Sequence, residues 1–352
     1  MAEVLLPGMF RAATLTNVLN LAPQKYGILS AQGLFKYMGI ATTTAAIMRE
    51  QAGLCLVQSG AWCAPPAVAN RGVQRDLIYI PVPHTSIADV VLPCDIAGQV
   101  TYDLNTPTGL KDMNSEVIKR SINARSKLEQ TLEYRQIRAM YGEVLDADGT
   151  VMQDLYSTFG IAPSNITWAI SSATFGLRKA CNDLTRLIRK RHSGNYTSIR
   201  FMVSAEGMDK IVNHKDAVDA YKRCCDTQFL VTEGTTGGKI FPFGGIEFWE
   251  YDAQGCYYDA QGVKQSVEFL APPSGFAPAD VVGVAYPQGA PEMYELLGAN
   301  PMRNDMVNQR ATQLYHVSIE PRCHNEGFDL KTEANALPIV KQPGSLIRVK
   351  LV

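Results

Sequence analysis

Three segments of this 352-residue chain predict an α+β fold. Residues 112–142 carry apolar side chains at helical spacing, residues 41–98 consist of β-rich runs and turns, and residues 168–270 alternate between helical and extended patterns. With 46% hydrophobic residues, a chain of this length can bury a core without disulfides or metals. Its 28 Gly and 19 Pro form no low-complexity tract, which excludes a fibrous or disordered protein.

Residues 1–40 have the pattern of an arm. Residues 14–21, which include Leu15 and Leu19, can form two helical turns before Pro23, and a second apolar patch follows over residues 28–38. Neither piece is long enough to be a stable helix alone. We therefore expect the arm to pack on something else, with Leu15 and Leu19 as candidate contacts.

Residues 41–98 read as a long β-hairpin. Two β-rich runs, at residues 53–59 and 77–82, flank a turn-rich stretch at residues 60–66. A two-stranded hairpin is marginal in water, so this one must lie on a neighbour, which can be another chain. The candidate contacts are three arginines, suited to carboxylates on the neighbour, and a stiff apolar tip; each arginine can equally be a solvated side chain. They are Arg49, Arg71, Arg75, Trp62 and Pro65.

Residues 112–142 predict one helix of about 45 Å, at 1.5 Å per residue. Asp112 or Asn114 can cap its start, and Gly142 ends it. We expect its charged side chains individually to form a solvated face; they are Lys119, Arg120, Arg125, Lys127, Glu129, Glu133, Arg135 and Arg138.

The rest of the chain alternates helix and strand. We expect helices over about 174–191 and 206–224, and strands over 198–204, 240–243, 246–251, 267–270 and 346–351. The first helix ends in several cations, which suits a helix C-terminus. The last strand places Ile347, Val349 and Leu351 on one face and Arg348 and Lys350 on the other.

The charge balance narrows the function classes. Lys plus Arg is 33 and Asp plus Glu is 34, a formal net charge of -1, whereas dedicated DNA-binding proteins carry a basic excess. Charged residues make up only 19%, below the usual ~25%. A charge-poor chain either covers its surface with copies of itself or is a loop-rich monomer. The sequence shows no signal peptide and no apolar run of about 18 residues, and it has eight Cys without CxxC spacing, so we expect no membrane and reduced thiols in a cytoplasm.

We find no specific catalytic, metal or cofactor motif. The loop Glu233–Lys239 lacks the spacing and the Ser/Thr of a phosphate-binding loop, and the grouping of His316, Cys323 and His324 matches no standard metal site. The pair Glu247 and Glu250 reads as a solvated strand face. We expect no cofactor, no metal and no enzyme. A Cys–His pair can meet in space, which leaves a Cys-dependent soluble hydrolase as a remote alternative.

The order of elements resembles the Hong Kong 97 capsid fold, and in particular the major capsid proteins of the phage lambda type, the protein E family. The stretches that carry the resemblance are residues 239–251, 262–264, 269–270, 200–207 and the terminal strand 346–352. The resemblance implies an arm at 1–40 and an extended loop at 41–98. It further implies a peripheral domain at 99–164 and 323–352 with the helix 112–142 as its spine, and an α/β axial domain at 165–322.

The resemblance also implies a function. Such proteins are head proteins of tailed double-stranded DNA phages, and they assemble as hexamers and pentamers into an icosahedral shell. The shell forms around a scaffold, joins a portal at one vertex, encloses DNA without binding it specifically, and often takes a decoration protein outside. We therefore expect the virion as the location, after synthesis in the host cytoplasm. An encapsulin-type compartment, which encloses protein cargo, is the alternative.

Two expectations concern assembly in particular. The chain begins only about a dozen residues before its first helical turn, so we expect a separate scaffolding protein and no large N-terminal cleavage. Some shells of this fold are welded by an isopeptide bond from a Lys on the extended loop. Residues 41–98 contain no Lys, and Arg cannot replace the amine, so we expect a non-covalent shell.

Overall fold

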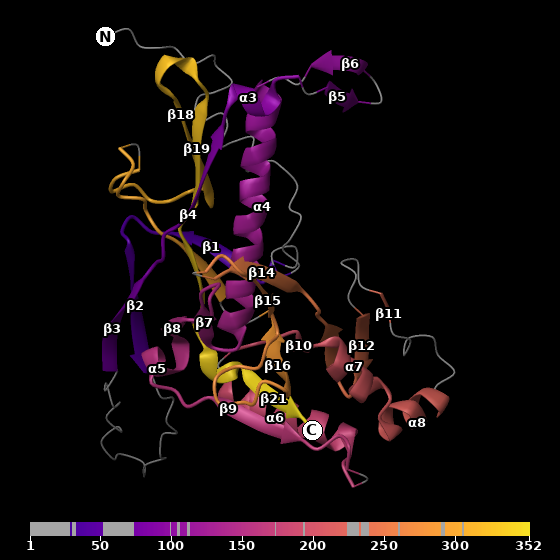
Figure 1. Ribbon diagram of the computed structural model, residues 1–352. Helices are drawn as coiled ribbons and strands as arrows, with labels where there is room; N and C mark the ends of the chain where they lie inside the picture. The colour runs from indigo at the N-terminus through magenta and orange to yellow at the C-terminus, as the bar shows by residue number, and fades with distance from the viewer. Residues whose placement is uncertain are drawn as a thin grey trace, which may run out of the picture.

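The computed structural model is built along one long helix (Figure 1). The three-stranded sheet of β18 (Tyr315–Pro321), β19 (Phe328–Ala334) and β4 (Thr85–Val91) and the strand pair of β5 (Val100–Asp103) and β6 (Thr106–Leu110) lie toward one end of this helix, and a seven-stranded sheet with three helices lies toward the other. The structure describes residues 29, 33–51, 74–98, 100–103, 106–110, 113–172, 174–192, 194–223, 232–233, 239–259, 261–289, 293–304 and 306–352.

The long helix is α4, Met113–Met140, close to the predicted range. It ends as expected before Gly142, whose φ of 83° favours glycine. Along it lies the three-stranded antiparallel sheet of β18, β19 and β4. The short helix α3 (Pro93–Ile96) and the pair β5 and β6 adjoin its first turn.

The prediction of a solvated charged face on α4 is wrong for five side chains and holds for Lys119 and Lys127, which are exposed. Strands β4, β19, β20 (Ala336–Val340) and β7 (Glu143–Leu145) all contact the helix, so little of its circumference reaches water. The buried charges find partners inside the protein, since an unpaired buried charge is costly. They are Arg125, Glu129, Glu133, Arg135 and Arg138.

The second half of the predicted arm is part of this subunit's own fold. Residues Phe35–Gly39 form β1, which pairs in parallel with β17 (Met293–Leu297), and β17 pairs with β20 (Ala336–Val340). The apolar patch at residues 28–38 therefore contributes the buried Leu29 and Phe35 to the main core. Leu15 and Leu19 lie outside the described residues.

The predicted hairpin is present as β2 (Thr44–Gln51) and β3 (Gln74–Pro81), paired from Thr44 opposite Pro81 to Gln51 opposite Gln74. The run at residues 53–59, predicted as a strand, lies outside the described residues, as does the turn-rich stretch that follows it. A second small pair, β7 (Glu143–Leu145) with β8 (Val151–Asp154), leads into the helix α5, Leu155–Phe159.

The seven-stranded sheet has the order β11-β12-β13-β10-β16-β21-β9. Its strands are β11 (Thr232–Glu233), β12 (Lys239–Phe243), β13 (Ile246–Glu250), β10 (Ser198–Val203), β16 (Val281–Gln288), β21 (Ile347–Leu351) and β9 (Ser164–Trp168). Helices α6 (Leu177–Arg191), α7 (Ala205–Val212) and α8 (Lys215–Arg223) share a hydrophobic core with it. The single helix predicted over 206–224 is thus two helices, because the chain turns at residues 213–214. A separate pair, β14 (Gln254–Tyr258) and β15 (Lys264–Glu268), runs back toward α4.

Strands from distant parts of the chain share sheets, and the domain ranges suggested by the sequence remain a prediction. The terminal strand β21 pairs with β16 and β9 inside the seven-stranded sheet. Strands β17 and β18 pair with β20 and β19, which contact α4. Two turns of 3-10 helix, Cys323–Asn325 and Pro343–Ser345, connect the final strands. The chain therefore passes repeatedly between the strands around α4 and the seven-stranded sheet.

Candidate inter-subunit surfaces

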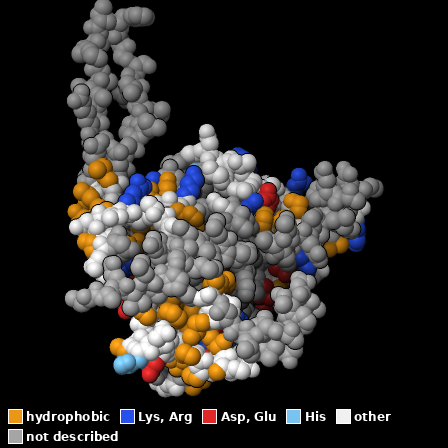
Figure 2. All heavy atoms as spheres, turned by 90° about the horizontal axis from the view of Figure 1, so that it is seen from above, with side chains coloured by type: hydrophobic (Ala, Val, Ile, Leu, Met, Phe, Trp, Pro, Cys, Tyr) orange, Lys and Arg blue, Asp and Glu red, His pale blue; other side chains and the backbone are white. Residues whose placement is uncertain are grey.

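The outward face of the β2–β3 hairpin is apolar. Met48 lies opposite Leu77, and Ala46 lies opposite Tyr79, so these four side chains share one face. Met48, Leu77 and Tyr79 are 60%, 58% and 67% exposed. Hydrophobic side chains also reach the surface in several other places (Figure 2). An exposed group of large apolar side chains on one hairpin indicates a surface that another molecule covers.

The opposite face of the same hairpin is already used within the subunit. Ala45 and Ile80 are buried in the main core, and Ile47 and Ile78 pack against it. The hairpin thus has two apolar faces, one buried against its own subunit and one exposed. A strand pair with one solvent-facing side normally has only one apolar face.

Arg49, a predicted inter-subunit contact, is held inside its own chain. Its guanidinium pairs with Asp76 at 2.5 Å across the hairpin and donates to the Phe159 carbonyl at 2.8 Å, at the end of α5. It therefore fixes the hairpin to the body of the subunit. Arg75 lies in β3 opposite Glu50. Trp62, Pro65 and Arg71 lie outside the described residues, so the inter-subunit roles of all these residues remain predictions.

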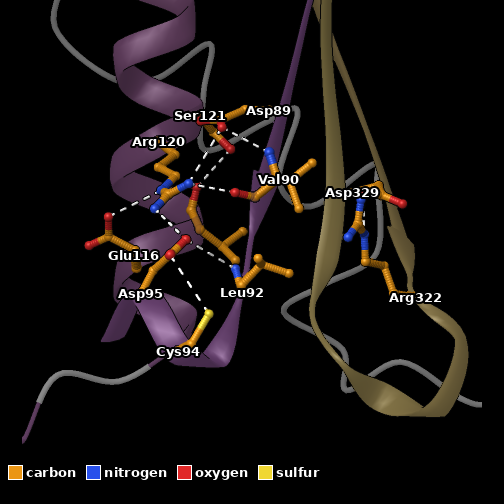
Figure 3. Close-up of polar contacts among 11 residues, drawn as sticks. Asp89, Val90, Leu92, Cys94, Asp95, Glu116, Arg120, Ser121, Arg322 and Asp329 are labelled. Carbon is orange, nitrogen blue, oxygen red and sulfur yellow. Dashed lines mark hydrogen bonds and ion pairs between the residues drawn. The ribbon is translucent and has the colours of Figure 1, made fainter. Parts of the chain in front are cut away.

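Arg120 joins three elements at the first turns of α4 (Figure 3). Its guanidinium lies 3.0 Å from Asp95 of α3, 3.4 Å from Asp89 of β4 and 3.3 Å from Glu116 of α4, and it also donates to the Val90 carbonyl. A planar guanidinium with several donors can satisfy all of these acceptors at once. This cluster fixes the end of the subunit from which β5–β6 departs. In the same view, Arg322, which directly follows β18, pairs with Asp329 of β19 at 2.8 Å.

Arg348 of β21 forms the joint between the sheet and the end of α4. The sequence correctly places Arg348 on the face opposite Ile347, but that face is buried. Arg348 donates to the Tyr141 carbonyl at 2.8 Å and pairs with Glu143 at 2.9 Å, and its guanidinium lies over the Tyr156 ring. Burial raises the pKa of Tyr141. No sequence signal separates this arginine from a solvated one, because its partners come from residues some 200 positions away.

Glu295 is a fully buried carboxyl in β17, facing α4. Its Oε2 accepts a hydrogen bond from the Gln136 side chain, while Oε1 has no hydrogen-bond partner in the described part of the chain. Burial raises the pKa of Glu295 to about 7, and the Gln136 bond and nearby Arg135 only partly offset this. The sequence around Glu295 gave no indication that this carboxyl would be fully buried.

The acidic, cysteine and histidine side chains considered as catalytic or metal-binding candidates do not come together in one site within the described ranges. Glu247 pairs with Arg200, and Glu250 lies 3.7 Å from Lys239, so neither is a free acid. Cys323 is exposed, and the described residues contain no group of three or more His, Cys, Asp or Glu side chains placed to hold a metal. The glycine-rich loop at 234–238 lies outside the described ranges. Among the described helices, none is long and apolar enough to cross a membrane.

Solved structures with the same arrangement of elements are capsid proteins. The chain resembles the capsid protein of Cyanophage P-SCSP1u with a TM-score of 0.55 at 10% identity, covering 94% of this chain and 90% of that one. It resembles a putative capsid protein of a prophage from E. coli CFT073 with a TM-score of 0.50 at 12% identity, covering 80% and 82%. The fold is therefore the Hong Kong 97-type capsid fold, which confirms the predicted fold class.

Sequence comparison identifies the family within this fold. The model of the family described as phage major capsid protein E matches residues 11–351. The major capsid protein of Salmonella phage Felix O1 is 23% identical over 366 residues, covering 97% of this chain and 96% of that protein. The chain belongs to the phage major capsid protein E family, and it is a structural protein of a tailed-phage capsid. The predicted function is confirmed, and the encapsulin and hydrolase alternatives are not favoured.

Proposed function

We propose that this capsid protein closes its shell by laying the outward face of the β2–β3 hairpin on an adjacent subunit, within hexamers and pentamers. The observation that carries the proposal is the group of exposed side chains Met48, Leu77 and Tyr79 on a hairpin whose other face is already buried. Covering a large apolar side chain contributes about 1.5–3 kcal/mol when burial is complete. These three side chains are already partly buried in the subunit. Covering each of them therefore contributes about 1 kcal/mol to one subunit contact, and the contribution is repeated at every such contact in the shell.

The way in which the hairpin is anchored supports this role. Val82 donates to the Thr43 carbonyl at 2.9 Å at the base of the hairpin, and Arg49 holds its middle to α5. A fixed hairpin presents its outer face in one orientation, so less conformational entropy is lost when a neighbour docks. The absence of Lys in residues 41–98 supports a contact without an isopeptide bond.

The remaining partners follow from the same function. We propose that a separate scaffolding protein guides assembly, that a portal occupies one vertex, and that a decoration protein can reinforce the outside. The protein is made in the host cytoplasm and ends in the virion, where it encloses DNA without sequence-specific binding. It has no catalytic activity and needs no cofactor or metal.

The proposal is tested by changing Met48, Leu77 and Tyr79 together to Ser and examining the particles by negative-stain electron microscopy. We expect no closed shells, with the far-ultraviolet circular dichroism of the unassembled subunit unchanged, because these side chains contribute little to its own core. The control changes Tyr258, Val263 and Met302 to Ser, which are 70%, 55% and 75% exposed elsewhere. Normal shells from the hairpin variant, or equal loss in both variants, would overturn the proposal.

A further inference from the structure

Helix α6 carries the strongest concentration of positive charge among the described helices. Its inner face, formed by Leu177, Cys181, Leu184 and Ile188, is buried against the seven-stranded sheet. Its outer face is exposed and carries six cations and the single acid Asp183; the cations are Arg178, Lys179, Arg186, Arg189, Lys190 and Arg191. This one helix therefore has a formal charge of +5 in a chain whose net charge is -1.

Most of these cations have no acidic partner in the described part of the chain. Arg186 pairs with Asp183 at 3.1 Å, but both side chains are more than half exposed, and such a pair contributes little. Arg189 donates to the Tyr196 hydroxyl, which is a neutral group. For the other four cations, the described residues offer no carboxylate within ion-pair distance. The outer face of α6 is thus available to an external anion.

Helix stability explains only part of this placement of positive charge. Cations in the last turn favour the helix dipole, which accounts for the three residues 189–191. Arg178 and Lys179 lie in the first turn, where a positive charge opposes the helix dipole, and that turn of α6 has no acid. The backbone N–H of Leu177, at the start of α6, donates a hydrogen bond to the Asp216 carboxylate of α8 at 2.8 Å. Arg186 and Lys190, four residues apart, also repel each other.

We propose that the outer face of α6 is the surface on which the subunit contacts the phosphate backbone of duplex DNA enclosed in the shell. Residues 178 to 190 span about 18 Å along the helix, which matches roughly five base pairs of duplex at 3.4 Å each. The helix lies on the outside of the sheet, at the edge of the molecule opposite β18–β19 (Figure 1). The proposal rests on the proposed function, since it requires a shell that encloses DNA.

The contact is weak for one subunit and acts through its repetition over the shell. If about four phosphates are neutralised, the logarithm of the binding constant falls with the logarithm of salt with a slope of about -3.6. Affinity then falls on the order of 100-fold between 50 and 200 mM salt. Such a contact holds the outer layer of packaged DNA against the wall and lets it slide during packaging and release. It also fits a chain with no overall basic excess.

The test compares two fourfold variants of the full chain. The first changes Arg178, Lys179, Arg186 and Lys190 to Gln, which keeps good helix formers on α6. The control makes the same change in net charge at four exposed lysines on other elements, namely Lys36, Lys119, Lys239 and Lys264. Binding of a fluorescent 25-base-pair duplex to unassembled subunits is measured by anisotropy from 50 to 200 mM salt, and shells are examined by electron microscopy.

We expect the α6 variant to lose at least 10-fold in DNA affinity at 50 mM salt and most of its salt dependence, while the control changes less than about threefold. Both variants should still form shells. Equal losses in the two variants, or unchanged affinity in the α6 variant, would overturn the proposal. Loss of shells in the α6 variant with DNA binding intact would show that α6 instead meets an acidic protein surface. Failure of wild-type subunits to form shells would count against the proposed function and not against the α6 contact.

Discussion

Replacing Glu295 by Gln should stabilise the subunit at pH 8 and remove much of its pH dependence above pH 5. The folded-state pKa is about 7, whereas an unfolded Glu titrates near 4.3. The folded state therefore holds the proton more tightly. Stability from this group is fully present below about pH 4.3 and is lost as the pH rises to about 7.

The magnitude follows from the size of the shift. The difference between about 7 and about 4.3 is about 2.7 pKa units, which at about 1.36 kcal/mol each gives roughly 4 kcal/mol as an upper value at pH 8. Gln has the same shape as Glu and carries no charge to desolvate. The Oε1 atom of Gln136, which has no hydrogen-bond partner among the described residues, can accept from the new amide. Little should change at pH 5, where Glu295 is already neutral.

The assay is urea unfolding of unassembled subunits from pH 5 to 8.5, with Glu268→Gln as the control because Glu268 is exposed on β15. We expect the wild-type and control midpoints to fall together as the pH rises, and the Glu295→Gln midpoint to stay higher at pH 8. Parallel curves for all three proteins would refute the reasoning, since they would mean that Glu295 titrates alike in the folded and unfolded chain.

Three further predictions concern Arg348, Gly142 and the assembled shell. Changing Arg348 to Met should destabilise the subunit by about 3–5 kcal/mol, measured by urea unfolding, because Glu143 then stays buried without its main partner; a change below 1 kcal/mol would contradict this. Changing Gly142 to Ala should cost a few kcal/mol, seen as a lower midpoint in thermal unfolding. The new Cβ would lie 2.1 Å from the Tyr156 ring at a φ of 83°; an unchanged midpoint would be inconsistent with this packing. Boiling mature particles in detergent should return one band near 38.6 kDa; a ladder that survives reducing agent would disprove a non-covalent shell.

The sequence predicted the elements whose pattern is local. Helix α4 was predicted because its apolar residues repeat at helical spacing and Gly142 supplies a stop, and both signals act within a few residues. The alternation in β21 was predicted for the same reason. The aggregate order of elements indicated the family, which the family model then showed. The candidate contacts at Leu15, Leu19, Trp62, Pro65 and Arg71 remain predictions, since they lie outside the described residues.

The tertiary structure alone decided which polar side chains are buried. Arg125, Glu133 and Arg138 look like a solvated face on α4, yet strands from distant parts of the chain enclose the helix. Arg49 looks like a surface contact, yet it bonds to Phe159, 110 residues away. Periodicity reports only which side chains share a face, and it carries no information on what later packs there. Burial depends on contacts between residues far apart in the chain, and therefore the environments of Arg348 and Glu295 emerged only once the strands were assembled.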